Sequence, residues 1–231
     1  MGALTNSRGA QKALIALLLA ANAGLILLAP HARAATPAPG ANGNAALVAQ
    51  VTSRLAQMKG VRAQFTQTQT LSAMKQPLLS TGSLVFYRER GAIWRVDTPY
   101  EAAYVITDAG VTQLDANGKR IGTKGAQGAP GVRGVAQVSK MMRAMLGGDL
   151  SALYSQFDVD VHGTASEWSL GLTPNQPQLA QAIKGLHMKG GAFLRSLRID
   201  LANGDVTRIE FTKSEALDDL PSAERTLLGA P

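Results

Sequence analysis

The sequence predicts a mainly β domain in which antiparallel strands are accompanied by a few helices. Two observations favour this fold class. Apolar residues alternate with polar ones over many short stretches, which is the period of a half-buried strand. Turn signals such as Asn117-Gly118 separate consecutive stretches. Because consecutive hairpins pair neighbouring strands in antiparallel fashion, a meander is expected instead of alternating strand–helix units.

The N-terminus predicts a secretory signal peptide over residues 1–34. A basic stretch with Arg8 and Lys12 precedes an apolar run from Ala13 to Ala29, and Ala32-Arg33-Ala34 has the small-x-small pattern of a cleavage site. An uncleaved membrane anchor is the alternative. The apolar run is slightly shorter than the roughly 20 residues that a spanning helix needs, which favours cleavage.

After this segment we expect a flexible lead-in at 35–46, rich in Ala, Pro, Gly and Asn, and a single domain over 47–231. The full chain carries a formal charge of +7. Three of its cations and no acid lie in the signal segment, so the remainder is only mildly basic. Since no long run of Lys and Arg accompanies this charge, nucleic-acid binding is not indicated. The absence of Cys excludes thiol chemistry, disulfides and cysteine metal sites.

Helical spacing recurs at a few places along the chain. Leu47 to Met58 predicts a first helix that ends before Gly60, a residue typical of helix C-termini. Val135 to Leu146 predicts a second helix, in an insertion that follows a Gly-rich loop. We interpret Pro177 to Gly185 as helical or loop-like, and the charged tail from Ser214 to Leu228 as a short helix.

Period-two alternation predicts strands on both sides of the insertion. Pro77 separates the first predicted strand from the second, and Asn203-Gly204 marks the turn of the last hairpin. The predicted strands are Val61–Leu71, Leu84–Tyr87, Ala92–Val96, Tyr104–Thr107, Val111–Leu114, Phe157–Val161, Trp168–Leu172, Ser196–Leu201 and Val206–Phe211.

Candidate residues for catalysis or metal binding are few. His162 and His187 are the histidines outside the signal segment, and they lack the spacing of known zinc motifs, so surface histidines are favoured over a two-His metal site. Asp158 and Asp160 lie two apart on a predicted strand and share a face. That face suits Ca²⁺ or acid catalysis, but solvent-facing acids are the simpler interpretation. No G-x-S-x-G motif is present, so we predict no enzymatic activity and no cofactor.

A methionine stripe marks the second predicted helix. Met141, Met142 and Met145 lie there at helical spacing with Val138. Methionine is unbranched and polarizable, so it suits surfaces that adapt to variable apolar partners, but it also fills gaps in ordinary cores. The stripe therefore predicts either a packed core helix or a lid over an apolar cavity.

An ordered series of short motifs lies between Leu55 and Leu114. The series consists of Arg62-Ala63-Gln64-Phe65-Thr66-Gln67, Gly82-Ser83-Leu84, Arg88, Trp94-Arg95, Pro99-Tyr100 and Thr107-Asp108-Ala109-Gly110. In its order and spacing this segment closely resembles the periplasmic outer-membrane lipoprotein carrier (LolA) family. The rest of the chain agrees with that family in its layout of strands and helices.

The resemblance implies an incomplete antiparallel β-barrel whose helices form a lid over an apolar cavity. The helix at 45–58 and the insertion near 135–154 would supply the lid. In the family, an arginine before the Trp hydrogen-bonds the lid backbone and helps to switch the lid between closed and open. Arg88 matches it by position, with Arg90 as the alternative. The expected cavity residues are Leu55, Phe65, Leu84, Phe86, Ile93, Trp94, Val138, Met141, Met142 and Met145.

The resemblance also implies a monomeric periplasmic carrier that encloses the acyl chains of lipoproteins and transports them. Its partners would be an inner-membrane transporter complex and an outer-membrane receptor. Two departures leave a carrier or sensor for another lipid or glycolipid open: an aromatic content of 5%, and a tail, Leu217–Pro231, unlike that of the best-studied branch. A hydrolase that uses the cavity as an acyl site is a further alternative, which the absence of a nucleophile–base motif disfavours.

Overall fold

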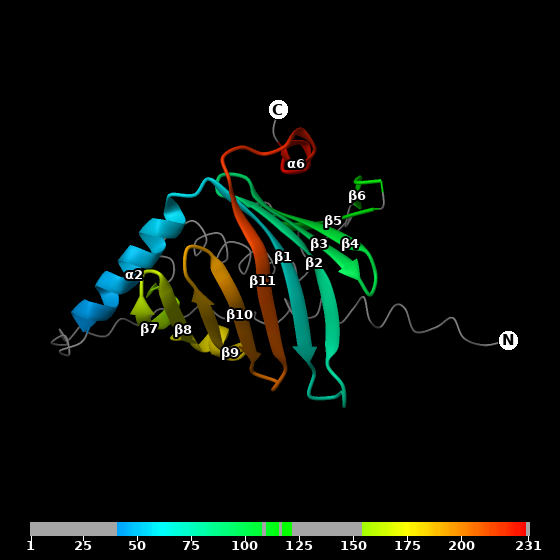
Figure 1. The fold of residues 1–231 in the computed structure, drawn as a ribbon. Coiled ribbons are helices and arrows are strands. Elements are labelled where there is room, and N and C mark those ends of the chain that lie inside the picture. The colour runs from blue at the N-terminus through cyan, green and yellow to red at the C-terminus, as the bar shows by residue number, and fades with distance from the viewer. Residues whose placement is uncertain (1–40, 108–109, 116, 122–153, 230–231) are drawn as a thin grey trace, which may run out of the picture.

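The computed structural model describes residues 41–107, 110–115, 117–121 and 154–229. Within them, one eleven-stranded sheet dominates the structure (Figure 1). The strand order is β6-β5-β4-β3-β2-β1-β11-β10-β9-β8-β7, and all neighbouring strands pair antiparallel. The edge strands β6 and β7 do not pair with each other among the described residues, so the sheet is an open barrel, as predicted.

The elements follow the chain in the order given by these bounds. The strands are β1 (Gly60–Thr70), β2 (Leu78–Tyr87), β3 (Gly91–Thr98), β4 (Ala102–Thr107), β5 (Gly110–Leu114), β6 (Arg120–Ile121), β7 (Phe157–Thr164), β8 (Glu167–Pro174), β9 (Ile183–Gly190), β10 (Leu194–Leu201) and β11 (Val206–Leu217). The helices are α2 (Ala41–Ala56), α5 (Pro177–Ala180) and α6 (Ser222–Leu227).

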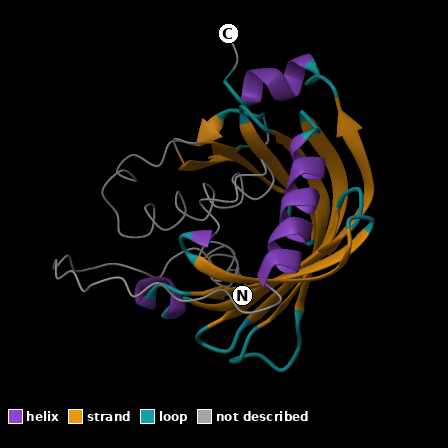
Figure 2. Cartoon of the chain, turned by 90° about the vertical axis from the view of Figure 1, so that its left-hand side faces the viewer, coloured by secondary structure: helices purple, strands orange, loops and turns teal. Residues whose placement is uncertain are grey.

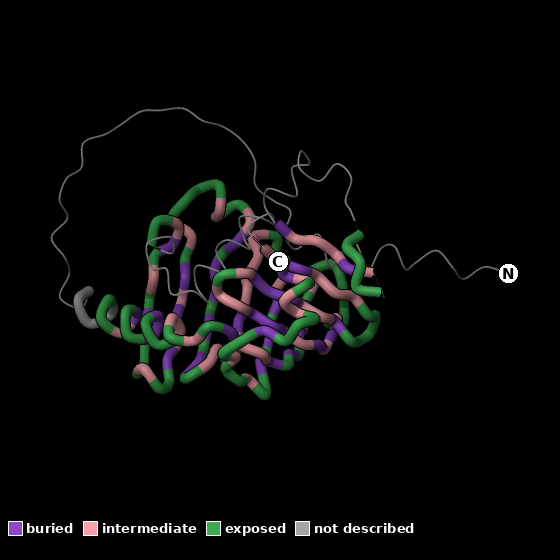
Figure 3. Tube along the Cα trace, turned by 90° about the horizontal axis from the view of Figure 1, so that it is seen from above, coloured by how far each residue is buried: buried purple, intermediate pink, exposed green. Residues whose placement is uncertain are grey.

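The pairing of β1 with β11 joins the first half of the sheet to the second. Phe65 lies opposite Phe211 and Gln69 opposite Thr207, which fixes the register along both strands. Burial alternates along β1, so that Phe65 points into the protein while Thr66 points to solvent. A similar alternation of buried residues with more exposed ones recurs along β8 and β11, whereas β2 and β3 each bury three consecutive residues (Figure 3). Nine of the strands therefore form where the period-two pattern predicted them, although β2 begins at Leu78 instead of Leu84, and β6 and β9 were not predicted.

The sheet buries a different apolar cluster on each face. The larger cluster lies on the concave face, around which the sheet curves, and it includes Val48 and Val51 of α2 (Figure 2). The smaller cluster lies on the opposite, convex face beneath α6. Its buried members are Val85, Ile93, Val105, Leu114, Leu220 and Leu228. The two faces are thus covered by helices from opposite ends of the described chain.

Helix α2 starts earlier and ends earlier than its apolar spacing predicted. It begins at Ala41 and therefore includes the second half of the expected lead-in, and it ends at Ala56. Gly60 is the first residue of β1 and not the end of the helix. A Cβ there would lie 2.7 Å from the Phe86 carbonyl oxygen, so close contact between β1 and β2 accounts for this glycine. No helix among the described residues is long and apolar enough to cross a membrane.

Two predictions in the C-terminal half were wrong in detail. The segment interpreted as helical or loop-like from Pro177 contains only the four-residue α5, and from Ile183 onward it is strand β9. The tail does not become helical at Ser214, because β11 continues to Leu217 and α6 begins only at Ser222. The predicted second helix, Val135–Leu146, lies outside the described residues.

Candidate functional site

A small apolar pocket lies on the concave face beside the C-terminal end of α2. Its volume is about 40 Å³, far below the roughly 300–1,000 Å³ of small-molecule sites. The lining comes from the end of α2 and the turn after it, from β1, β2, β10 and β11, and from the link between β9 and β10. It consists of Leu55, Met58, Val61, Ala63, Leu84, Phe86, Phe193, Leu194, Phe211 and Ser214. Only one of these side chains is polar, so the pocket favours an apolar occupant. Its present volume is enough for little more than one small chemical group.

Arg88 holds the end of α2 next to this pocket. Its Nη2 donates to the carbonyl oxygen of Met58 at 2.8 Å and to that of Leu55 at 3.2 Å. Its backbone N–H donates to the carbonyl oxygen of Lys59 at 2.9 Å. The last carbonyls of a helix lack partners within the helix, and a cation near them is favourable because the helix dipole is negative there. Arg88 therefore caps α2 from the β2–β3 turn.

The structure separates the two arginines that the sequence left as alternatives. The backbone N–H of Arg90 donates to the carbonyl oxygen of Tyr87 within the turn, and the described residues show no side-chain contact of Arg90 with α2. Arg88 Nε is buried without a hydrogen-bond partner in the described part of the chain. A buried unpaired donor is costly, so this guanidinium is held in place without full satisfaction of its donors.

A second arginine holds α2 at the edge of the sheet. Arg54 Nη1 donates to the carbonyl oxygen of Ala165, in the turn between β7 and β8, at 3.0 Å. Between Arg54 and the N-terminal part of the helix, Val48 and Val51 are almost fully buried in the concave cluster. Helix α2 is thus attached by apolar packing along one side and by arginine–carbonyl hydrogen bonds near its end.

The predicted cavity residues do not all lie at the pocket. Leu55, Leu84 and Phe86 line it. Phe65 and Trp94 belong to the same cluster and stack on each other, with ring centroids 3.8 Å apart. The prediction was wrong for Ile93, which is fully buried in the convex cluster. Successive strand residues point to opposite faces, so Ile93 and Trp94 cannot share one. The remaining predicted residues, Val138, Met141, Met142 and Met145, lie outside the described residues.

The concave face also buries polar side chains that the sequence motifs did not single out. Gln67, Gln69, Ser80 and Thr207 are each less than a tenth exposed. Their positions have the parity of inward-facing residues on β1, β2 and β11. The sequence signal that could have identified these residues is their place in the period-two alternation. At those positions a strand of this pattern carries its inward-facing side chains, which are otherwise apolar.

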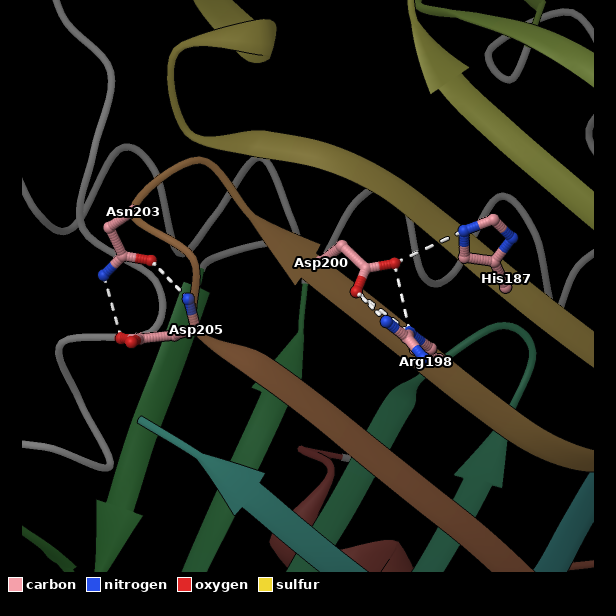
Figure 4. A network of polar contacts seen from close by, with 5 residues as sticks. All are labelled: His187, Arg198, Asp200, Asn203 and Asp205. Carbon is pink, nitrogen blue, oxygen red and sulfur yellow. Dashed lines mark hydrogen bonds and ion pairs between the residues drawn. The ribbon is translucent and has the colours of Figure 1, made fainter. Parts of the chain in front are cut away.

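The histidines lie on the solvent side of the sheet, in exposed polar clusters. His162 Nε2 lies 2.8 Å from Asp160 Oδ2, and both side chains are mostly exposed. His187 Nε2 lies 3.3 Å from Asp200 Oδ2, which also pairs with Arg198 (Figure 4). The hydrogen bond and the charge of Asp200 raise the pKa of Arg198. No group of three or more possible metal ligands occurs among the described residues.

Sequence reasoning missed one pair with the spacing of a catalytic motif, because it found no S-x-x-K in the chain. Ser72 and Lys75 have the S-x-x-K spacing of a serine nucleophile and its base. Both are exposed in the connection between β1 and β2, and the Ser72 hydroxyl donates to Asp205 Oδ1 at 2.9 Å. The backbone N–H of Ser72 also donates to this carboxylate. These contacts join two neighbouring turns, so the pair is part of a turn structure and not of a pocket.

Comparison with known proteins places this fold and site in context. Residues 40–219 match the family described as outer membrane lipoprotein carrier protein LolA-like. No curated protein matches the chain. Among solved structures, the chain is similar to MucB, with 13% identity, 81% of this chain and 63% of that chain covered, and a TM-score of 0.47. It therefore spans less than two thirds of the length of MucB.

Two shorter solved proteins are covered almost completely. The chain is similar to a LolA superfamily protein from Nitrosomonas europaea, with 9% identity, 77% of this chain and 94% of that chain covered, and a TM-score of 0.38. It is also similar to lipoprotein LppX from Mycobacterium tuberculosis, with 9% identity, 77% and 100% coverage, and a TM-score of 0.38.

Proposed function

The chain belongs to the outer membrane lipoprotein carrier protein LolA-like family, and from this premise we propose that it is a periplasmic lipoprotein carrier. It binds the acyl chains of lipoproteins on the concave face of its sheet and shuttles them from the inner to the outer membrane. It is secreted through the signal peptide at residues 1–34. It works as a binding protein without a cofactor and not as an enzyme.

The observation that carries this proposal is the apolar concave face with a helix capped over it by Arg88. Each CH₂ group removed from water contributes roughly 0.8 kcal/mol. A cargo with two or three chains of about sixteen carbons would therefore cost tens of kcal/mol to expose to water. A soluble carrier has to hide these chains during transport, and a largely apolar surface beneath a movable cover meets that need.

The size of the pocket indicates how binding would proceed. The pocket of about 40 Å³ between the described residues cannot by itself hold an acyl chain, and movement of α2 away from the sheet would enlarge it when cargo enters. The two hydrogen bonds from Arg88 to Met58 and Leu55 oppose this movement, and bonds to a charged donor contribute about 1.5–3 kcal/mol each. This cost is small beside the gain from burying acyl chains, so cargo opens the lid and loss of cargo lets it close.

The energy for loading and release would then come from the membrane partners. An inner-membrane transporter complex hands over the cargo, and an outer-membrane receptor accepts it. The carrier itself needs only two arrangements of α2, closed and open, whose free energies differ by a few kcal/mol. Arg88 sets that difference.

Native mass spectrometry of the purified protein with an acylated lipoprotein tests the proposal. We expect a one-to-one complex for the wild type, and an altered release of cargo for Arg88→Leu because the closed state loses its cap. Arg90→Leu is the matched control, since it removes an arginine from the same turn that does not contact α2. Absence of any complex in the wild type would refute the carrier function.

A second candidate function is a carrier or sensor for another lipid or glycolipid. The buried Oγ1 of Thr207 favours it, because this atom has no hydrogen-bond partner among the described residues and an acyl chain supplies none. Lipid extraction from protein purified from its native host distinguishes the two. Free lipid or glycolipid bound to the protein, together with no complex with acylated lipoprotein, would replace the first function by the second.

A further inference from the structure

Four buried polar side chains form one patch on the concave face, which we call the polar patch: Gln67, Gln69, Ser80 and Thr207. Gln69 on β1 lies directly opposite Thr207 on β11, and Gln67 lies directly opposite Ser80 on β2. Side chains directly opposite each other in a sheet have Cβ atoms about 4.5–5.5 Å apart. Since Gln67 and Gln69 are two residues apart on one strand, the two pairs are neighbours on the same face.

The polar patch lies farther along the sheet than the apolar pocket. On β1, Ala63 lines the pocket, Phe65 stacks on Trp94, and Gln67 and Gln69 follow. At about 3.3 Å per residue, Gln69 is about 20 Å from Ala63 along the strand. Along β1 the concave face is therefore apolar at one end, aromatic in the middle and polar at the other end, whereas Ile199 of β10, opposite Thr207, packs against the apolar cluster. This order matches an amphiphile that lies along β1.

The polar patch is costly for a protein that needs only an apolar core. Thr207 Oγ1 is buried without a hydrogen-bond partner among the described residues, and such a group costs about 1–3 kcal/mol. A valine there would fill the same space without this cost. Thr207 is therefore better explained by a ligand that supplies the missing partner than by packing.

The residue types in the patch define the chemistry of that ligand. Glutamine amides and hydroxyls both donate and accept hydrogen bonds and carry no charge. A buried phosphate or carboxylate would need a cation to compensate for its charge, and the patch contains none. A neutral carbonyl group, as in an ester or an amide, fits donors of this kind.

We propose that the polar patch binds the neutral ester or amide groups that join the acyl chains of the cargo to its head group. The chains then run over Phe65 and Trp94 toward the pocket beside α2. This inference rests on the proposed function and adds to it, because it assigns the direction in which the cargo lies and a contact that selects acyl esters over plain hydrocarbon chains.

Two lipids that differ only in their carbonyl groups test this assignment. The probes are dipalmitoyl phosphatidylcholine and its dihexadecyl ether analogue, which keeps the chains and the head group but lacks the ester carbonyls. We expect the wild type to bind the ester lipid about fivefold to tenfold more tightly, which is the effect of one hydrogen bond of about 1 kcal/mol or slightly more. Thr207→Val and Gln69→Leu should bind both lipids equally.

Matched controls lie on the same strands with their side chains on the solvent side. Thr212→Val on β11 and Gln64→Leu on β1 replace exposed residues of the same types, so they should keep the preference for the ester. Thr207→Val should be as stable as the wild type or more stable in urea denaturation, because it removes an unpaired buried hydroxyl. A loss of preference in that variant is therefore not caused by unfolding.

The outcomes separate this inference from the function on which it rests. Equal affinity of the wild type for the two lipids, or a preference that survives both patch variants, would overturn the role of the polar patch and leave the carrier function standing. If the wild type bound neither the two lipids nor an acylated lipoprotein, the carrier function and the inference would both fail.

Discussion

Helix α2 on the concave face and helix α6 on the convex face cover the same sheet in different ways. Helix α6 is anchored by Leu220 and Leu228, which pack against a cluster in which Ile93 is fully buried. Helix α2 is anchored by Val48 and Val51, but its C-terminal end lies beside a pocket and is held by hydrogen bonds from Arg88.

The buried polar atoms that lack hydrogen-bond partners also differ between the two faces of the sheet. Arg88 Nε, next to the end of α2, and Thr207 Oγ1, on the concave face, are the buried side-chain atoms without partners in the described part of the chain. The convex cluster consists of apolar side chains. The convex face is therefore a packed apolar core that stabilises the fold. The concave face has a pocket and unpaired hydrogen-bonding atoms, which a ligand can fill and pair.

The largest expected difference between the faces comes from shortening one apolar side chain on each. Ile93→Ala, on the convex face, should lower the free energy of unfolding by about 2–5 kcal/mol, because no space exists there for relaxation. Leu84→Ala, beside the pocket, should cost less stability but weaken binding of an acylated lipoprotein. Urea denaturation and titration with the lipoprotein measure the two effects. Equal losses of stability with unchanged binding would show that both faces are ordinary cores.

A smaller effect is expected from the cap of α2. Arg88→Leu removes the charged donor to the carbonyls of Met58 and Leu55, which should cost about 1.5–3 kcal/mol for each hydrogen bond lost. The loss should appear mainly as faster hydrogen exchange of α2 amides, while the strands of the convex cluster keep their protection. Arg90→Leu is the control and should change neither. Uniformly faster exchange over the whole sheet would mean that Arg88 supports global stability and not a movable lid.

The ion pair of α6 should contribute still less. Arg62 Nη2 lies 3.4 Å from Glu224 Oε1, with Glu224 mostly buried and Arg62 partly exposed. Glu224→Gln should cost about 1 kcal/mol or less, and the cost should shrink with added salt. Glu215→Gln, which removes a longer and more exposed contact of the same arginine, is the control. A larger loss for Glu224→Gln, independent of salt, would mean that charge and not apolar packing anchors α6.

The smallest effect is expected where neither helix is involved. Hydrogen bonds from the backbone N–H and the hydroxyl of Ser72, and one from Asn203, lower the pKa of Asp205. A carboxyl group with a lowered folded-state pKa stabilises the fold above its ordinary pKa, and this contribution is lost as the pH falls through the folded-state value.

Asp205→Asn should therefore reduce stability slightly at neutral pH, and its difference from the wild type should vanish in strongly acidic solution. Urea denaturation at several pH values measures this. Asp158→Asn, at another exposed site on the sheet, is the control. A difference that persists unchanged in acid would mean that the Asp205 side chain acts through its shape and not its charge.

Much of the fold was predictable from local sequence patterns, but two strands were missed, the two-residue β6 and the longer β9. In β1 the alternation of Val61, Ala63 and Phe65 with polar neighbours predicted the strand, which the structure confirms, with Ala63 and Phe65 buried. In β9 Leu186 and Met188 alternate with His187 and Lys189. Gly185 and Gly190 flank these residues, and glycine weakens the sequence signal of a strand. The neighbouring Pro177 then favoured a helical or loop-like interpretation.

The sequence by itself determined which residues alternate and therefore which side chains share a face, because a strand has a period of two. Applied strictly, that rule alone puts Ile93 and Trp94 on opposite faces of the sheet. The order of residues also placed Arg88 at a turn before the Trp. Only the tertiary structure decided what these residues meet. Arg88 reaches the carbonyls of Leu55 and Met58 because the pairing of β1 with β2 places Tyr87 opposite Gly60, just after α2. Gln69 lies opposite Thr207 because β1 pairs with β11, a distant segment whose register no local pattern specifies.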